Sequence, residues 1–206
     1  MAQLMKGSFM ENRTQGKLFI ISGPSGTGKS TLVREVIKRL NPKIAIERVV
    51  TYTARPPREG EVDGKDYHFV SHDEFKAKRK DGFFLEDTLF ADKPYATPAS
   101  VLDDLKLGKH CIVVPDKYGA KEMHKIVSDA VLIWVIPPNV EILKQRLCAR
   151  NTETHEQMEK RLKIAKNELA EEDKNRDYKY HLVNDVFDRA VAELELIIKD
   201  ELGKNA

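Results

Sequence analysis

The chain has 206 residues, of which 41% are hydrophobic and 33% charged, and its formal net charge is +2. This is typical of a globular protein with one domain, or with a core domain that carries smaller inserted parts. The balanced charge gives no reason to expect attraction to nucleic acid or to an acidic membrane. No stretch approaches the roughly 20 apolar residues of a membrane span, and residues 1–16 lack the apolar core of a signal peptide. We therefore expect a cytoplasmic protein with a flexible tail over residues 1–16.

The first predicted strand and helix are separated by a glycine-rich loop. Residues 17–22 contain the apolar run Leu-Phe-Ile-Ile, which indicates a buried strand, and residues 30–40 have apolar side chains at helical spacing. Asn41-Pro42 then ends the helix. The loop from Gly23 to Ser30 reads G-x-x-x-x-G-K-S, the pattern of a phosphate-binding loop. A chance match is disfavoured, because the strand and the helix stand on the correct sides of the motif.

The residue types in this loop fit the binding of a nucleoside triphosphate. Glycines let successive N–H groups point at phosphate oxygens, and the helix N-terminus adds a favourable dipole. Lys29 can reach the β- and γ-phosphates, and the Ser30 hydroxyl can bind Mg²⁺. The residues expected to bind ATP are Gly23, Pro24, Ser25, Gly26, Thr27, Gly28, Lys29, Ser30 and Thr31. The loop alone does not separate kinases from ATPases, GTPases or motors.

Further along the chain, the pattern predicts a small mixed part and then a return to alternating strands and helices. Short strand-like pieces at residues 49–53, 67–70 and 83–86 surround a helix that Ser71 and Glu74 cap. Thr97 is the expected N-cap of the next helix, with Pro98 at its first position and Gly108 at its end. The remaining predictions are strands at 110–114, 131–136 and 181–183, and helices at 139–149, 154–172 (capped by Thr154) and 185–202. The fold class is therefore α/β, a parallel sheet flanked by helices.

The segment from residue 50 to 67 is dense in groups that bind phosphate. Arg55 and Arg58 flank two prolines, which stiffen the backbone, and guanidinium groups suit bidentate contact with a phosphate monoester. Glu61 can orient one of these arginines, and Tyr67 adds a neutral donor. A solvated loop whose charges have no function is the alternative.

At these residues the sequence resembles the guanylate kinase family. Residues 53–67 read T-x-R-P-x-R-x-G-E-x-D-G-x-D-Y, and residues 69–75 read F-V-S-x-D-E-F, as in the GMP-binding region of that family. Matches continue in family order through Phe84-Leu85-Glu86, Tyr95-Ala96-Thr97, Asp116, Arg146-Leu147, Lys160-Arg161-Leu162 and Val183-Asn184-Asp185. The resemblance covers roughly residues 18–202.

The resemblance implies a fold, a reaction and a set of site residues. It implies a P-loop NTPase core at 17–48 and 98–206, with a helical lid at about 150–162, and an inserted GMP-binding subdomain at 49–97. It implies ATP-dependent phosphorylation of GMP, and of dGMP, to the diphosphate in purine nucleotide metabolism. ATP and GMP would be the substrates and Mg²⁺ the ion, with a monomer or homo-oligomer as the assembly. The residues implied to bind GMP are Thr51, Arg55, Arg58, Glu61, Tyr67, Glu86, Tyr95, Thr97 and Asp116.

Individual roles also follow from the resemblance. Thr51 would donate to guanine O6, and Glu86 would accept from N1–H and the N2 amino group, which adenine does not match. Asn184 would lie beside the adenine of ATP. The residues implied to act in catalysis are Lys29, Arg55, Arg146, Arg150 and Arg161, the last three in the lid and its base. Structural alternatives remain: a surface carboxylate for Glu86, a packing role for Tyr95, and solvated helix charges for Arg150 and Arg161.

One departure from the family pattern bears on catalysis. The family carries two aspartates one residue apart after the GMP region, and here the first of them is Val114 while the second is Asp116. A lost carboxylate that holds Mg²⁺ or its waters would reduce turnover. The alternatives to an ATP:GMP phosphotransferase are a catalytically weak guanylate-kinase-like binding module and a kinase for another phosphorylated acceptor. Lys29 and Ser30 count against the first alternative, and Thr51 and Glu86 count against the second.

Overall fold

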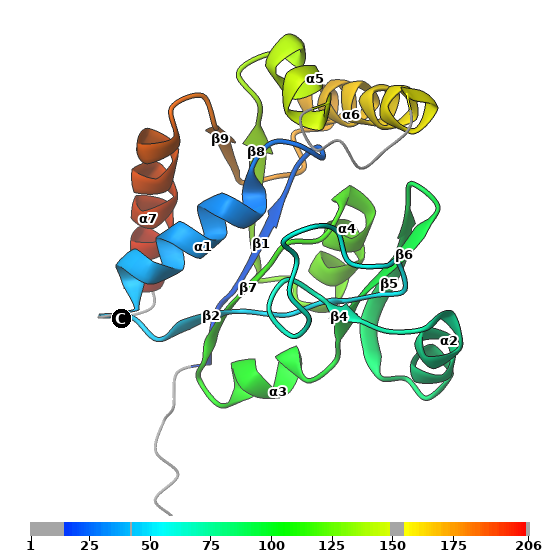
Figure 1. Cartoon of the computed structure of the whole chain (residues 1–206). Helices are drawn as coiled ribbons and strands as arrows, with labels where there is room; N and C mark the ends of the chain where they lie inside the picture. The colour runs from blue at the N-terminus through cyan, green and yellow to red at the C-terminus, as the bar shows by residue number, and fades with distance from the viewer. Residues whose placement is uncertain (1–14, 42, 149–154, 205–206) are drawn as a thin grey trace, which may run out of the picture.

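The computed structural model describes residues 15–41, 43–148 and 155–204, and a five-stranded parallel sheet lies at its centre (Figure 1). The strand order is β2-β7-β1-β8-β9. The strands are β1 (Leu18–Ser22), β2 (Ile46–Arg48), β7 (His110–Val113), β8 (Val131–Ile136) and β9 (Tyr180–Val183). The predicted α/β fold with a parallel sheet flanked by helices is confirmed, and each buried strand expected from the sequence lies in this sheet.

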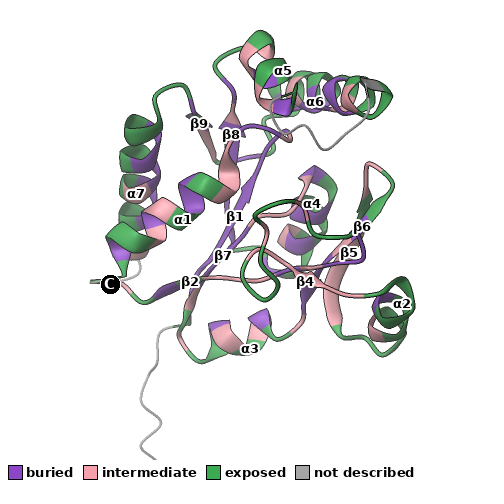
Figure 2. Ribbon diagram, in the orientation of Figure 1, coloured by how far each residue is buried: buried purple, intermediate pink, exposed green. Residues whose placement is uncertain are grey.

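Both faces of the central strand are buried, as its continuous apolar run predicts. Phe19 and Ile21 pack into a core cluster with α1 (Lys29–Leu40) and α7 (Phe187–Gly203). Leu18 and Ile20 point to the other face, against α3 (Val101–Lys106) and α4 (Lys117–Ile126). Figure 2 shows the buried strands between helices whose outer surfaces are exposed. Alternate side chains of β1 therefore join two helical layers, and the loop that follows β1 starts from a fixed point.

A second sheet is built from the segment between β2 and α3. Its order is β4-β3-β6-β5, with β3 parallel to β4 and antiparallel to β6. The strands are β3 (Tyr52–Thr53), β4 (His68–Phe69), β5 (Phe84–Phe90) and β6 (Lys93–Pro98). Phe75 of α2 (His72–Lys80) is buried against this sheet, and the Ser71 hydroxyl accepts from the backbone N–H of Glu74, as predicted.

Two helices lie across the end of the central sheet where β1 and β8 end (Figure 1). They are α5 (Val140–Cys148) and α6 (His155–Asn175), and they share a small cluster of Leu143, Leu147 and Ala165. Cys148 is exposed at the end of α5 and contacts Met158 of α6. Cys111 lies in β7, where burial raises the pKa of its thiol to about 11, and both cysteines are free.

The structure corrects the prediction that Thr97 and Pro98 begin a helix. Both residues belong to β6, and α3 begins at Val101, with Ser100 as its N-cap. Thr97 is fully buried and pairs with Glu86 of β5, so strand pairing outweighs a local capping preference. Pro98 pairs only with Phe84, beyond the residues of β6 that pair with β3, so its missing N–H costs no bond to that strand.

Gly16, expected at the end of the flexible tail over residues 1–16, packs against the folded protein. Gly16 is buried, and its N–H donates to the carbonyl oxygen of Leu105 over 2.8 Å. Residues 1–14 and 149–154 lie outside the described residues. The predictions for Arg150, for Thr154 and for the start of the lid fall in the second of these ranges. Within the described parts of the chain, the helices are too short or too polar to cross a bilayer.

Glu201 of α7 holds the edge of the fold together through buried charge pairing. It is 2% exposed, and its carboxylate accepts from Lys179, Lys204 and the Tyr180 hydroxyl, while Lys17 donates to its carbonyl oxygen over 2.7 Å. These partners join the start of β1, the β9 segment and the last turn of α7. Burial alone would raise the pKa of this carboxyl, but the hydrogen bonds from Lys204, Tyr180 and Lys179 outweigh burial and lower it.

We predict that Glu201→Gln lowers the free energy of unfolding by about 2–3 kcal/mol at pH 7, because three cationic groups lose their counter-charge. The lowered pKa means that the wild-type contribution is complete above the ordinary glutamate value of 4.5 and is lost as pH falls below it. Urea unfolding at pH 7 and pH 3 should therefore show a difference that narrows at pH 3. Glu193→Gln, at an exposed position on the same helix, is the control. A constant difference between the two pH values would contradict the assignment.

Candidate active site

The loop between β1 and α1 has the backbone that a phosphate site needs. Gly23, Gly26 and Gly28 have φ values of 142°, 92° and 87°, a region that other residues rarely occupy. A Cβ atom on Gly23 would stand 2.4 Å from the carbonyl oxygen of Val135 in β8. The loop can therefore lie this close to the sheet only with glycine at this position.

Side chains within and behind the loop fix its shape. The Lys29 ammonium donates to the carbonyl oxygens of Gly23 (2.6 Å) and Pro24 (2.8 Å). Thr27 is fully buried and its hydroxyl donates to Pro24, while the Asn184 amide donates to the carbonyl oxygen of Thr27 over 2.7 Å. Pro24, Thr27 and Asn184 thus support the loop from behind. The predicted residues of the loop that line the pocket are Gly23, Ser25, Gly26, Gly28, Lys29, Ser30 and Thr31.

The opposite wall of the same pocket holds a buried carboxylate with an open acceptor. Oε1 of Glu86 accepts from the Thr97 hydroxyl over 2.7 Å. Oε2 is buried and has no hydrogen-bond partner within the described residues. Burial raises the pKa of Glu86 to about 7, and the neighbouring charge of Asp116 adds to the effect. A buried acceptor without a donor is costly, so this oxygen is suited to a ligand that brings an N–H group.

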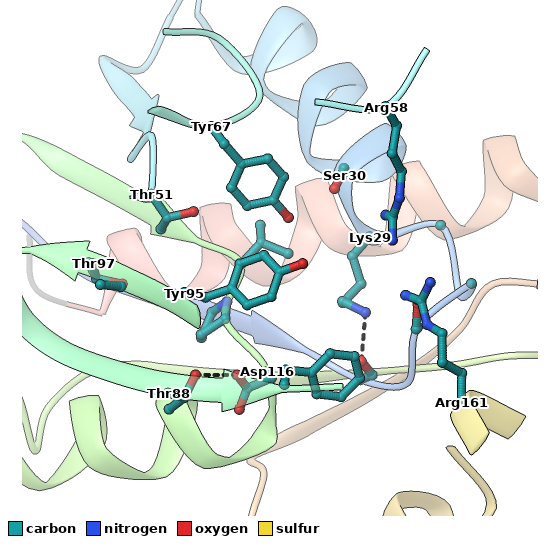
Figure 3. A pocket seen from close by; sticks show the side chains of 18 of the residues that line it. Lys29, Ser30, Thr51, Arg58, Tyr67, Thr88, Tyr95, Thr97, Asp116 and Arg161 are labelled. Carbon is teal, nitrogen blue, oxygen red and sulfur yellow. Dashed lines mark hydrogen bonds between the residues drawn. The ribbon is translucent and has the colours of Figure 1, made fainter. Parts of the chain in front are cut away.

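The predicted acceptor residues gather around Glu86. Thr51 is buried directly before β3, and Tyr67 and Tyr95 turn their hydroxyl ends toward the side of the pocket that holds Lys29 (Figure 3). Arg58 reaches the same side from its loop (Figure 3). The predicted residues that line this wall are Thr51, Arg58, Tyr67, Glu86, Tyr95, Thr97 and Asp116. A hydrogen-bonding end near Glu86 and a cationic end near Lys29 therefore face one another across one cavity.

Arg55 lies behind this wall, where hydrogen-bond acceptors surround its guanidinium group. Its Nη1 and Nη2 atoms donate to the Glu61 carboxylate at 2.6 and 2.7 Å, and its Nε donates to the Tyr95 hydroxyl at 3.0 Å. Nη1 also donates to the carbonyl oxygen of Pro56, and the guanidinium lies 5.0 Å from the centre of the Tyr67 ring. Glu61 therefore orients Arg55, as predicted. Most of the Arg55 donors are occupied by protein groups, so the guanidinium acts through charge and through Tyr95 more than through a bidentate fork.

Asp116 has a structural task in addition to its place in the pocket wall. Its Oδ1 accepts from the backbone N–H groups of Tyr118 (2.8 Å) and Gly119 (3.0 Å) and so caps α4. Its Oδ2 accepts from the Thr88 hydroxyl. Sequence reasoning missed Thr88 and Phe90, which also line the pocket. Both follow Glu86 at strand spacing, so the period of two along β5 was the signal that could have found them.

Two of the predicted arginines of the lid region, Arg161 and Arg146, lie in different places relative to the pocket. Arg161 of α6 is 8% exposed, lines the pocket and donates to the hydroxyl of Ser25 in the loop. Arg146 of α5 lies behind the loop and donates to the carbonyl oxygen of Asn184 over 3.2 Å. Lys160, next to Arg161, contacts Asp92 in the turn between β5 and β6. One turn of α6 therefore contacts both walls of the cavity.

Known proteins with the same features were found by comparison of sequence and structure. A family model described as "Guanylate kinase" matches residues 15–201. The chain belongs to the guanylate kinase family. The guanylate kinase of Protochlamydia amoebophila is 40% identical over 185 residues, which are 89% of this chain and 90% of that protein. The guanylate kinase of Clostridium tetani is 39% identical over 188 residues, covering 91% of this chain and 87% of the relative.

A solved structure supports the same family assignment. The crystal structure of guanylate kinase from Anaplasma phagocytophilum matches with a TM-score of 0.74 at 25% identity. The match covers 91% of this chain and 87% of that chain. Together with the family match over residues 15–201, the guanylate kinase family accounts for nearly the whole chain.

The residues at the loop fit a nucleotide-bound Mg²⁺ ion. Ser30 is half-buried at the N-terminus of α1 and lines the pocket, which is the position from which a hydroxyl can reach such an ion. Within the described residues, no three His, Cys, Asp or Glu side chains form a cage that would hold a metal alone. Mg²⁺ on a nucleotide does not need one, because phosphates and water supply most of its ligands.

We predict that Lys29→Ala weakens the binding of ATP with Mg²⁺ by roughly 30- to 100-fold, because a charge-assisted contact with the phosphates is lost. Titration calorimetry at fixed ionic strength measures the affinity. Lys38→Ala is the matched control, since Lys38 lies on the same helix with its side chain 68% exposed. Equal affinities of wild type and Lys29→Ala would show that the Lys29 ammonium does not contribute to phosphate binding.

Proposed function

We propose that this guanylate kinase family member transfers the γ-phosphoryl group of ATP to the phosphate of GMP, giving ADP and GDP, and that it accepts dGMP in the same way. The observation that carries the proposal is the open, buried oxygen of Glu86 across the pocket from Lys29. In this proposal the second sheet belongs to a GMP-binding subdomain of residues 49–97. Residues 17–48 and 98–206 form the ATP-binding core, and α6 belongs to a lid.

In this proposal Glu86 selects guanine because its carboxylate needs hydrogen-bond donors from the base. Guanine presents N1–H and the N2 amino group side by side, whereas adenine presents an acceptor at N1. Adenine would leave the buried Oε2 unpaired, and such a loss costs several powers of ten in specificity. Thr51, on the same wall, supplies a hydroxyl for guanine O6. The sugar is not part of this recognition, which is the reason to expect dGMP as a second acceptor.

The phosphate of GMP is held at the cationic end of the pocket. Arg58, Tyr67 and Tyr95 supply donors there, and Arg55 adds positive charge from behind while Glu61 and Tyr95 fix its orientation. The phosphate is a dianion near neutral pH and needs no general base to act as the nucleophile. The protein's work is to bring two anionic groups into line and to neutralise their charge.

Lys29 and Arg161 neutralise the negative charge of the ATP phosphates. Lys29 contacts the transferred group from the loop, and Arg161 contacts it from α6 while it is anchored on Ser25. Mg²⁺ held with Ser30 supplies further charge neutralisation. Because α6 also contacts the β5–β6 turn through Lys160, it can cover both substrates and exclude water, which would otherwise hydrolyse ATP.

The metabolic role that follows is the production of GDP in purine nucleotide metabolism. The alternative is a guanylate-kinase-like module that binds GMP but transfers phosphate poorly, and Val114 in the pocket wall is the observation that favours it. The intact loop, with Lys29 bonded at its centre, favours the enzyme. Measurement of ADP release decides between the two.

We predict that ADP release is stimulated by GMP and dGMP and by none of AMP, CMP and UMP. Glu86→Gln should raise the KM for GMP by about 100-fold or more, because one acceptor becomes a donor that faces guanine N–H groups. Activity with AMP that equals activity with GMP would contradict the assignment. GMP binding without ADP release would favour the binding module.

The same variant tests the protonation state of Glu86. A pKa of about 7 means that the carboxylate accepts fully above that pH and becomes protonated below it. Wild-type GMP affinity should therefore fall as pH is lowered from 8 to 6 by more than it falls in Glu86→Gln. The variant corrects for titration of the GMP phosphate itself. Parallel curves would show that Glu86 does not titrate in this range.

We predict that Gly119→Ala separates acceptor binding from stability. A Cβ atom at Gly119 would stand 2.9 Å from Oε2 of Glu86, so it would displace the carboxylate, while alanine suits helix α4 better than glycine. The melting temperature should stay equal or rise, and the KM for GMP should increase about tenfold. Gly203→Ala is the control, because no atom lies within 4 Å of its added Cβ. Unchanged GMP kinetics in Gly119→Ala would contradict the assignment.

A further inference from the structure

The buried face of α6 carries charged side chains at regular spacing. Arg161, Ala165, Glu168 and Glu172 are all buried, and their separations of four, three and four residues place them on one stripe of the helix. A buried stripe that contains three charged groups is uncommon, since such groups are almost never fully buried unless they are paired. Each of these charges therefore needs a partner on the body of the protein.

Partners for the two ends of the stripe are evident. Arg161 donates to Ser25 in the phosphate loop. At the other end, Glu172 accepts from the backbone N–H of Tyr178 over 3.2 Å and contacts Nε2 of His181 over 2.8 Å. Glu168 lies between them, about 10 Å along the axis from Arg161 at the rise of an α-helix.

A neighbouring ion pair shows which part of the protein lies beside the stripe. Glu171 pairs with the ammonium of Lys117 over 3.2 Å, and Lys117 is the first residue of α4, directly after the N-cap Asp116. Glu168 therefore lies on α6 between Arg161, which contacts the phosphate loop, and Glu171, which contacts the start of α4.

One oxygen of Glu168 has no such partner among the residues that the structure describes. Glu168 is 5% exposed, and its Oε2 is buried without a hydrogen bond in the described part of the chain. Burial raises the pKa of Glu168 to about 7, and the first charge that opposes the rise is the ammonium of Lys29. The carboxylate of Asp116 adds to the rise. The protein therefore keeps an unsatisfied carboxylate close to the lysine of the phosphate loop.

The other acid near the loop is already in use. Both oxygens of Asp116 are occupied, one by the N-terminal amides of α4 and the other by Thr88, and Val114 has no polar group to offer. Mg²⁺ on a nucleotide keeps several of its waters, and sites for it usually provide one or two carboxylates. Glu168, unlike Asp116, keeps an open oxygen among the described residues.

We propose that Glu168 is a positioning residue for the phosphate-bound Mg²⁺ ion and that it accepts hydrogen bonds from water molecules that the ion carries. This inference depends on the proposed binding of ATP with Mg²⁺ at the loop. It explains why a buried carboxylate stands without a donor in the free protein: the donor arrives with the ion. It also gives α6 two contacts with the ATP side, a cation at Arg161 and an anion at Glu168.

The test measures how much Mg²⁺ improves nucleotide binding. ATP affinity is determined by calorimetry with Mg²⁺ and again with EDTA, for wild type, Glu168→Gln and the control Glu171→Gln. Removal of a group that orients a metal's ligands typically costs 10- to 100-fold in metal affinity. We expect Glu168→Gln to reduce the Mg²⁺-dependent gain in affinity by at least about tenfold, with affinity in EDTA equal to wild type. Glu171→Gln, with its side chain 53% exposed, should keep the full gain.

A second readout observes the ion itself. Mn²⁺ replaces Mg²⁺ on a non-hydrolysable ATP analogue, and its electron paramagnetic resonance linewidth reports the order of its waters. Wild type and Glu171→Gln should share one spectrum, and Glu168→Gln should give a broader one. If Glu168→Gln does not fold, Glu168→Asp, which keeps the charge on a shorter stem, should give an intermediate loss of the gain. An unchanged gain and spectrum in a folded Glu168 variant would overturn this inference alone. Failure of wild type to bind ATP would overturn the proposed function and this inference together.

Discussion

Buried charge without a full set of partners is the constraint on which this active site depends. Glu86 in the pocket wall and Glu168 on the buried face of α6 each keep a buried oxygen that has no donor in the described residues. Arg55 and Glu61 show the opposite case, since their bidentate pair satisfies both groups before any ligand arrives. The fold keeps the unsatisfied oxygens because packing elsewhere outweighs their cost. In the function proposed above, the substrates bring the N–H groups and the cation that complete the set.

The architecture explains how such groups come together from distant parts of the chain. The central parallel sheet is buried on both faces, and the loop after β1 and the residues after β7 meet at one edge. The second sheet adds its wall because β5 pairs with β6 and places Glu86 opposite that edge. Helix α6 crosses both walls, since its residues Lys160 and Arg161 contact Asp92 and Ser25. A ligand in the cavity is therefore surrounded by three elements that are far apart in sequence.

The predictability of these features depended on how local their causes are. The loop and the strand before it were predicted well, because closely spaced glycines and a run of apolar residues determine their backbone conformation. The guanine-binding role of the wall around Glu86 was predicted from resemblance to a family and stays a prediction, since no local pattern reveals that Glu86 is buried. Thr97 and Pro98 were assigned to the wrong element because pairing with β5, a long-range contact, outweighs the local preference. The open oxygen of Glu168 could not have been predicted, because it depends on which partners three other helix residues take.

The contrast between the two cysteines has a practical consequence for testing the proposed lid. Cys111 is 3% exposed and its thiol has a raised pKa, so it is a poor nucleophile toward labelling reagents. Cys148 is exposed at the end of α5, in contact with Met158 of α6. A thiol-directed dye would therefore attach at a single place, where α5 meets α6. The native chain thus carries its own attachment point for a fluorescent reporter that could test the proposed closure of α6, without any engineered cysteine.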